Sequence, residues 1–336
     1  MKSKRWTTFF ALIIMTGTLV YSQDVKPFLG RWALDLPMGA GWIEVKQEDG
    51  YLDGSYLWIG GSVLPADFVY LDGNKLIMIR SREVIRKKDD TGKALKTQVI
   101  STSMEFTLNG DMLEGRAVTP VASGIGADEI KITGKRIPEP GPAPDLSKIK
   151  FGQSVTLFNG KDLNGWSLKE KNARSGWKVV DGELVNDPLQ PENGQHVYYG
   201  NLRTDRVFND FNLKLDVNVP EGSNSGVYLK GIYEVQVMDS YQRPIDSHNM
   251  GAIYSRITPI VGAEKPAGEW QTLDITLCKR HVTVILNGTK IIDNQPISGV
   301  TGGAMTADEF IPGPIYLQGD HGKVIYRNMV LTPILE

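Results

Sequence analysis

Short runs that alternate apolar and polar residues recur along most of the chain, and glycine-containing pairs separate them. A period of two is that of a half-buried strand, and Asp-Gly and Asn-Gly pairs favour tight hairpins. The pairs are Asp49-Gly50, Asp53-Gly54, Asp72-Gly73, Asn109-Gly110 and Asn287-Gly288. No amphipathic helical pattern of useful length interrupts the runs. The sequence therefore predicts an all-β protein built from antiparallel sheets.

A proline-rich segment, residues 138–147, divides the chain into two predicted domains. It contains four prolines in ten residues, which favours an extended, semi-rigid linker. Residues 24–137 read as about eight short strands, typical of a small barrel or sandwich. Their start, Gly30-Arg31-Trp32, resembles the G-x-W opening of lipocalin-like barrels, and we expect an accessory or packing role. Residues 148–336 read as about twelve strands, typical of a jelly-roll sandwich of two sheets.

The N-terminus has the pattern of a targeting segment. Residues 2–5 include three positive charges, and residues 9–20 are apolar but too short to span a bilayer comfortably. Small residues near Ser22 fit a cleavage site, so we predict a signal peptide over residues 1–22. The mature protein would then be periplasmic or secreted. An uncut N-terminal helical anchor is the alternative.

The composition of the remaining chain limits its partners. The full sequence has 37 Lys and Arg against 39 Asp and Glu, and loss of the three N-terminal charges leaves a net charge of about −5. This balance argues against nucleic acid as a partner. No later stretch is long and apolar enough for a membrane helix, so we expect no membrane span after cleavage.

The most informative polar pattern lies in residues 223–241, where two strands are predicted to form a hairpin. Glu234 and Gln236 share one face of the second strand, about 7 Å apart. One extra residue in that strand, a bulge, would bring Asp239 onto the same face. Two carboxylates and an amide would then lie together on one sheet surface.

Five further residues are candidates for the same site. By alternation, Tyr228 and Lys230 share a face of the first strand, and an aromatic ring there could stack on a sugar. His321 follows a predicted strand within QGDHGKV, in a loop of the kind in which sites concentrate, and Gln318 lies close to it in sequence. His248 lies in a loop, residues 244–251, that could form a rim over the site.

Several motifs together resemble one family, the 3-keto-disaccharide hydrolases, in family order over about residues 151–333. The motifs are Val155-Thr-Leu-Phe-Asn-Gly-Lys-Asp-Leu-Asn-Gly-Trp166, Trp177-Lys-Val-Val-Asp-Gly-Glu-Leu184, Asp210-Phe-Asn-Leu-Lys-Leu215, Asn224-Ser-Gly-Val-Tyr-Leu229, Tyr233-Glu-Val-Gln236 with Asp239-Ser-Tyr241, Gly268-Glu-Trp270, and Gly313-Pro-Ile-Tyr-Leu-Gln318 with His321-Gly322. The resemblance implies a concanavalin-like jelly roll with the site on its concave sheet. It also implies a sugar substrate first oxidised to the 3-keto form, and hence an upstream sugar oxidoreductase as a functional partner.

A 3-keto sugar defines the chemistry that such a site must perform. The ketone makes the C2 hydrogen acidic, so a base can remove it, the C1 substituent can leave, and water can add to the product. Glu234 and His321 are the candidate acid and base, with their order left open. Lys230, Gln236 and Gln318 could hold the ketone or the ring hydroxyls, and Asp239 could orient His321.

Three alternatives remain open at the level of sequence. A divalent cation held by Glu234, Asp239 and His321 could stabilise the enolate, although no metal-binding spacing is present. A lectin-like module could bind sugar without a titratable pair. A conventional retaining glycosidase would need two carboxyl groups about 5–5.5 Å apart, and the spacing Glu234-x-Gln236-x-x-Asp239 echoes such sites but has Gln in the middle position.

Overall fold

The computed structural model describes residues 24–37, 39–191 and 194–335. Within these ranges every regular element is a strand apart from one 3-10 helix, η1 (Lys26–Phe28), so the all-β prediction is confirmed. The predicted signal peptide lies outside the described residues. None of the described helical residues forms a segment able to cross a membrane.

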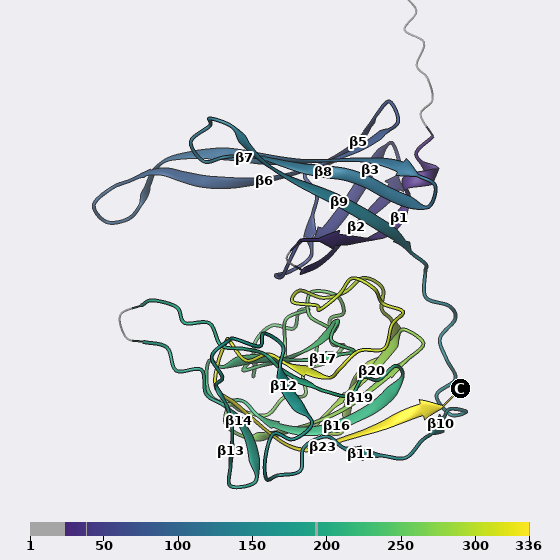
Figure 1. Cartoon of the computed structure of the whole chain (residues 1–336), viewed down its shortest axis with the longest axis vertical. Coiled ribbons are helices and arrows are strands. Elements are labelled where there is room, and N and C mark those ends of the chain that lie inside the picture. Colours follow the sequence, from purple (N-terminus) through teal and green to yellow (C-terminus); the bar gives the residue numbers. More distant parts are fainter. Residues whose placement is uncertain (1–23, 38, 192–193, 336) are drawn as a thin grey trace, which may run out of the picture.

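The first domain is a closed β-barrel (Figure 1). Its strands are β1 (Gly30–Leu36), β2 (Gly39–Glu48), β3 (Tyr51–Leu57), β4 (Leu64–Pro65), β5 (Phe68–Asp72), β6 (Lys75–Lys88), β7 (Ala94–Asn109), β8 (Met112–Pro120) and β9 (Ala127–Ile137). They pair in the order β2-β1-β9-β8-β7-β6-β5-β3-β4, and an additional β2–β3 pairing closes the ring. Closure removes the free edges of the ring itself.

Apolar side chains fill the barrel. Trp32, Leu34, Met104 and Phe106 are fully buried within one cluster. They come from opposite sides of the ring and point inward because alternate residues of a strand face the same side. The barrel is therefore a packed core. The hairpin β6–β7 continues beyond this core as a long exposed ribbon, which Figure 1 shows projecting from the barrel.

The second domain is a sandwich of two antiparallel sheets. The larger sheet has the order β13-β14-β23-β16-β19-β20-β21, with β10 and β11 also pairing with β23. Its strands are β10 (Lys150–Phe151), β11 (Val155–Thr156), β13 (Trp177–Val180), β14 (Glu183–Asn186), β16 (Phe211–Asn218), β19 (Trp270–Cys278), β20 (His281–Leu286), β21 (Thr289–Pro296) and β23 (Val324–Leu335). The hairpin predicted at Asn287-Gly288 is present between β20 and β21, with both residues at positive φ.

The smaller sheet positions the candidate site. Its strand order is β12-β15-β22-β17-β18. The strands are β12 (Trp166–Leu168), β15 (Leu202–Thr204), β22 (Tyr316–Leu317), β17 (Asn224–Leu229) and β18 (Tyr233–Met238). Val227, Leu229, Tyr233, Val235 and Val237 belong to the apolar cluster between the two sheets. The alternate residues of β17 and β18 therefore face away from that core, toward the other side of the sheet.

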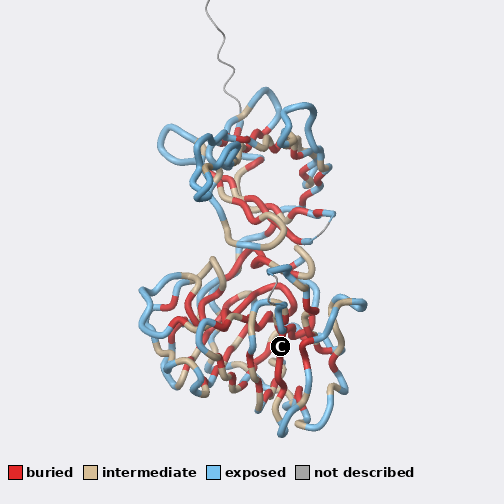
Figure 2. The backbone as a smooth tube through the Cα atoms, turned by 90° about the vertical axis from the view of Figure 1, so that its left-hand side faces the viewer, coloured by how far each residue is buried: buried red, intermediate tan, exposed pale blue. Residues whose placement is uncertain are grey.

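The two domains share buried apolar surface as well as the linker. Ala40, Trp42, Leu57 and Ile137 of the barrel belong to the same buried cluster as the sandwich core. Trp42 Nε1 donates a 2.8 Å hydrogen bond to the carbonyl oxygen of Val300. Figure 2 shows buried backbone of both domains meeting where they adjoin. The accessory domain is thus packed onto the sandwich, in addition to being tethered to it.

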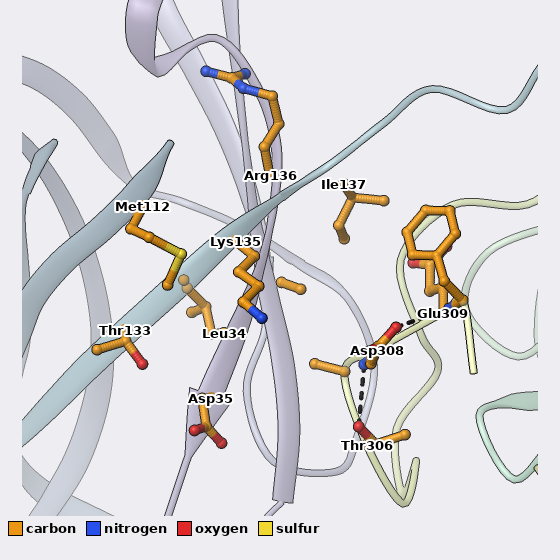
Figure 3. Close-up of a pocket in the computed structure, with 14 residues that line it drawn as sticks. Leu34, Asp35, Met112, Thr133, Lys135, Arg136, Ile137, Thr306, Asp308 and Glu309 are labelled. Carbon is orange, nitrogen blue, oxygen red and sulfur yellow. Dashed lines mark hydrogen bonds between the residues drawn. The ribbon is translucent and has the colours of Figure 1, made fainter. Parts of the chain in front are cut away.

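On one side of this interface the domains face each other across a cavity of about 450 Å³. Figure 3 shows Asp35 and Lys135 of the barrel on one wall and Thr306 and Asp308 of the sandwich on the other. Thr306 Oγ1 accepts a 3.1 Å hydrogen bond from the amide of Asp308, which holds the sandwich loop in a tight turn. Ile137 of the barrel lines this cavity and also belongs to the apolar cluster that the two domains share around Trp42.

Candidate active site

Three side chains form a row across the outer face of the smaller sheet. In the strand register Tyr228 lies opposite Glu234 on one side and opposite Tyr316 on the other. The Tyr228 and Tyr316 rings stack with centroids 4.0 Å apart and an interplanar angle of 10°. The hydroxyl oxygen of Tyr228 lies 2.7 Å from Oε2 of Glu234. The period of two in β17 and β18 thus brings an acid and two aromatic rings together.

The next row contains Gln236, Gly226 and Gln318. Gly226 lies opposite Gln236, and the amide of Gln318 donates to the carbonyl oxygen of Gly226. The side-chain oxygens of both glutamines are buried and have no hydrogen-bond partner within the described residues. An unpaired buried amide oxygen is costly. Both glutamines line the pocket, where a donor from a bound molecule would satisfy these oxygens once the amides turn toward it.

Gly226 makes room for the carboxyl group of Glu234. A Cβ atom at position 226 would lie 2.2 Å from Oε1 of Glu234 and 2.9 Å from its Cδ. No side chain can occupy that space while Glu234 keeps its position. The family motif residue Gly226 is thus explained by the placement of the acid.

The contacts of Tyr228 indicate where a proton resides. Besides Glu234, its hydroxyl is within hydrogen-bond distance of the carbonyl oxygen of Gly302. A hydroxyl has a single proton, and carbonyl and carboxylate oxygens only accept. Both contacts are satisfied together when Tyr228 donates to Gly302 and a protonated Glu234 donates to the tyrosine oxygen.

Burial acts on Glu234 in the same direction. The side chain is 3% exposed, and desolvation raises the pKa of its carboxyl to about 8. No cation is among the causes that shift this pKa. At neutral pH the carboxyl is therefore mostly neutral and has a proton to give.

A loop from the far end of the sequence holds this arrangement. The amide of Glu234 donates a 2.8 Å hydrogen bond to Oγ1 of Thr301, and Thr301 is bonded in turn to the carbonyl oxygen of Ile232. The neighbouring residue Gly302 supplies the acceptor for Tyr228. The loop thus fixes both the backbone of the acid and its hydrogen-bond partner.

These rows form the floor of a pocket of about 530 Å³. Its lining residues are Gly60, Gly61, Lys169, Glu170, Ala173, Tyr198, Tyr199, Asn201, Asn224, Tyr228, Glu234, Gln236, Tyr254, Gly302, Gly303, Tyr316, Gln318, Asp320 and His321. Five of the predicted site residues therefore meet here, namely Tyr228, Glu234, Gln236, Gln318 and His321. His321 is exposed and lies in the loop between β22 and β23, so its ring is open to solvent and substrate.

Sequence reasoning missed the pocket's cation, Lys169. Its Nζ lies 5.4 Å from the centroid of the Tyr316 ring and 3.4 Å from Oε1 of Glu170. Glu170 accepts a 3.1 Å hydrogen bond from the amide of Asn201, and Asn201 Oδ1 accepts one from Gly319. Lys169 directly follows the short strand β12, and nothing in its local sequence distinguishes it from a solvated lysine.

The prediction that Lys230 shares the face of Tyr228 is wrong. Lys230 is the first residue of the β17–β18 turn and has a φ of +53°, which ends the alternation of the strand. Its Nζ donates instead to Oδ1 of Asn209 at 3.1 Å and to the carbonyl oxygen of Glu309 at 3.0 Å. Desolvation lowers its pKa. Lys230 thus lies in a different cavity, beside the linker.

The predicted bulge that would place Asp239 in the site is also absent. Strands β17 and β18 pair without a register shift, from Asn224 opposite Met238 to Leu229 opposite Tyr233. Asp239 follows the end of β18, and its Oδ2 accepts a 3.0 Å hydrogen bond from the amide of Gly222. It stabilises that turn and does not line the pocket, so it is not placed to orient His321.

His248 lies beside the pocket and does not line it. Its Nε2 is 3.0 Å from Oγ of Ser62 in the barrel, and its ring contacts Tyr254 edge-on, with centroids 4.9 Å apart. It lines a neighbouring interdomain cavity with barrel residues. The predicted rim is therefore a contact with the first domain.

The residues do not fit the divalent cation that we considered. Asp239 is engaged outside the pocket, and the described part of the chain contains no group of three or more His, Cys, Asp or Glu side chains placed to hold a metal ion. The other acid near His321, Asp320, instead accepts from the amide of Tyr199 at 2.6 Å and lies 3.0 Å from His196. We therefore assign no step to a metal ion.

Comparison with known proteins agrees with the motifs. A curated 3-keto-disaccharide hydrolase of Bacteroides thetaiotaomicron is 25% identical over 166 residues, which cover 41% of this chain and 57% of that protein. The chain thus matches less than two thirds of that relative's length.

Two solved structures from Parabacteroides distasonis, both described provisionally as glycosyl hydrolases, are similar to part of this chain. The first is 29% identical, with a TM-score of 0.44, and the match covers 57% of this chain and 92% of that chain. The second is 23% identical, with a TM-score of 0.45, covering 55% and 94%. The profile of the 3-keto-α-glucoside-1,2-lyase-like domain matches residues 153–332, more than half of the 336 residues. The chain therefore belongs to the 3-keto-α-glucoside-1,2-lyase-like domain family.

Proposed function

We propose that this protein cleaves the glycosidic bond of 3-keto-glycosides by elimination followed by hydration. The observation that carries the proposal is Glu234, a buried carboxyl with a pKa raised to about 8, at the floor of an open pocket. A strongly shifted acid in a cleft is typical of an active site. Membership of the family, and a relative named as a 3-keto-disaccharide hydrolase, support the same reaction class.

The reaction begins at the carbon next to the ketone. A base removes the C2 proton, and the electron pair moves into the C2–C3 bond to form an enolate at the C3 oxygen. When the ketone re-forms, a C1–C2 double bond appears and the C1–O bond breaks, with an acid protonating the leaving oxygen. Addition of water, OH to C1 and H to C2, completes a net hydrolysis.

The pocket contains a group for each of these steps. Glu234 is the acid, because it is protonated at neutral pH. His321, exposed in the same pocket, is the base at C2. Lys169 supplies positive charge for the enolate oxygen. Gln236 and Gln318 accept hydrogen bonds from ring hydroxyls through their unpaired oxygens.

Two other functions explain the site less well. A lectin binds sugar without proton transfer and has no need of a buried acid that costs stability when it ionises. A retaining glycosidase needs a second free carboxylate close to the first. Of the other carboxylates in the pocket, Glu170 is bonded to Asn201 and Asp320 to Tyr199 and His196.

The cellular setting follows from the sequence and the substrate. The predicted signal peptide supports export to the periplasm or beyond, and the net charge argues against nucleic acid as a partner. The 3-keto group has to be made by oxidation of a C3 hydroxyl, so we propose that an oxidoreductase acting on the intact glycoside supplies the substrate.

The decisive experiment compares a glucoside with its 3-keto counterpart. We expect the protein to release the aglycone from the 3-keto compound alone, and we expect deuterium at C2 to slow release or to wash out into water. Equal cleavage of the unoxidised glucoside would contradict the mechanism, because its C2–H bond is not acidic. Retention of all C2 deuterium at an unchanged rate would contradict it equally.

Substitution of Gly226 by alanine should displace the carboxyl group of Glu234 while leaving residue 234 a glutamate. The new methyl group would overlap Oε1 of Glu234, so the carboxyl must leave its place beside Tyr228. We expect kcat on a 3-keto-glucoside to fall roughly tenfold to a hundredfold, as displaced catalytic groups do. Gly141→Ala is the matched control, because a Cβ there meets no atom within 4 Å. An unchanged kcat in Gly226→Ala would show that the observed position of Glu234 is not needed.

A further inference from the structure

The barrel contributes a turn to the pocket of the second domain. Residues 58–63 connect β3 to β4, and Gly60 and Gly61 within this turn line the same pocket as Glu234. Both glycines have positive φ, +81° and +72°, so the turn presents bare backbone to the pocket. No side chain of the barrel is among the residues that line it.

The sandwich holds this turn in place from one side by three hydrogen bonds. Oγ of Ser62 lies 3.0 Å from Nε2 of His248 and 3.2 Å from the hydroxyl of Tyr254, which itself lines the pocket. The amide of Val63 donates to Oγ of Ser255 at 2.9 Å. The turn is therefore fixed to the sandwich and does not hang free from the barrel.

On its other side the turn lies directly on Gly302. A Cβ atom at position 302 would be 2.2 Å from the carbonyl oxygen of Gly61 and 2.8 Å from its nitrogen. Gly302 in turn accepts the hydrogen bond of Tyr228, which contacts Glu234. A continuous chain of contacts therefore runs from the barrel turn to the acid.

We propose that this barrel turn is a wall of the leaving-group subsite and limits the size of the group that is expelled. The proposal rests on the function proposed above, in which Glu234 protonates the leaving oxygen. The group attached to that oxygen then extends past Glu234 into the part of the pocket lined by Gly60 and Gly61, which Tyr228 and Gly302 connect to the acid. The 3-keto ring lies over the side of the pocket that contains Gln236 and Gln318. The barrel thereby acts in specificity, beyond its packing role.

The test narrows the leaving-group subsite by a substitution in the barrel turn and measures kcat/KM for leaving groups of increasing size. Gly60→Asn adds a side chain where no atom lies within 4 Å, and asparagine tolerates positive φ. We expect kcat/KM for a 3-keto-disaccharide to fall about tenfold or more relative to that for 3-keto-glucosyl fluoride, the range that a misfit in a pocket produces. Gly50→Asn, in a barrel turn with φ of +89° and equally open space, is the matched control and should leave this ratio unchanged.

A second variant weakens the attachment of the barrel turn to the sandwich. It keeps the proposal testable if Gly60→Asn fails to fold. Ser62→Ala removes the contacts with His248 and Tyr254, and we expect the same ratio to rise in favour of the larger leaving group. If the wild type is active and neither variant changes the ratio of the two kcat/KM values, the barrel turn does not limit the leaving group. That result would overturn this proposal and leave the proposed function standing. A wild type that cleaves no 3-keto-glycoside of the series would overturn both.

Discussion

Glu234→Gln is expected to lower kcat on a 3-keto-glucoside by roughly 10²–10⁴-fold, the usual contribution of a general acid. Glutamine keeps the shape of the side chain and its contact with Tyr228 but has no proton to give to a leaving oxygen. In the wild type kcat/KM should fall as pH rises through about 8, where Glu234 loses its proton. The measurement is a set of initial rates across pH for both proteins.

Asp239→Asn is the control for this variant. Asp239 lies five residues further along the chain and caps the turn at Gly222 outside the pocket, so its substitution should leave kcat unchanged. A Glu234→Gln protein with near-normal kcat on a 3-keto-glucoside would remove Glu234 from the mechanism. A larger loss of kcat in Asp239→Asn than in Glu234→Gln would show that Asp239, and not Glu234, is the acid that the reaction needs.

The Glu234→Gln variant should also be more stable toward unfolding than the wild type at alkaline pH. The pKa of Glu234 is raised from 4.5 to about 8 in the folded protein, so folding favours the protonated form. The stability of the wild type is therefore highest below the unfolded pKa and falls as pH rises from about 4.5 to about 8. At pH 8 the cost is on the order of 3–5 kcal/mol, and glutamine does not incur it. Urea unfolding at pH 5 and pH 8 measures the difference, which should grow with pH.

Arg280→Met is expected to destabilise the protein by about 3–5 kcal/mol, the cost of leaving a buried charge unpaired. Nη2 of Arg280 lies 2.7 Å from Oε2 of Glu309, whose side chain is fully buried. Tyr233 also donates to this carboxylate, at 2.9 Å, and Gly299 donates to it from the loop that precedes Thr301. Loss of the arginine leaves these two neutral donors to compensate the charge, and the loop that holds the acid should loosen. Denaturant unfolding measures the free energy.

Lys290→Met provides the matched control, because Lys290 forms a 2.9 Å ion pair with Asp293 at the surface, where both side chains are about half exposed. Exposed pairs contribute about 0–1 kcal/mol, so this variant should unfold close to the wild type. Adding Glu309→Gln to Arg280→Met should recover part of the lost stability, since it removes the unpaired charge. Equal stability of both single variants would show that the buried pair is not needed.

Local sequence patterns were sufficient for the fold class and for the core of the site. Alternation within a strand depends on neighbouring residues alone, so Glu234 and Gln236 were correctly expected on one face. The linker and the family motifs are also contiguous in sequence. The same reasoning failed at Lys230, because a residue with positive φ in the turn no longer follows the alternation of the strand.

Other parts of the site depend on contacts between distant segments, which no local pattern reveals. Lys169 reaches the ring of Tyr316, and the barrel turn at Gly61 lies on Gly302. The raised pKa of Glu234 arises from its burial in the folded protein. The sequence could indicate an acid and a tyrosine on one hairpin, but the burial that keeps the acid protonated exists only once the sandwich has packed, and the wall beside it only once both domains have folded, because each requires residues brought together by tertiary packing.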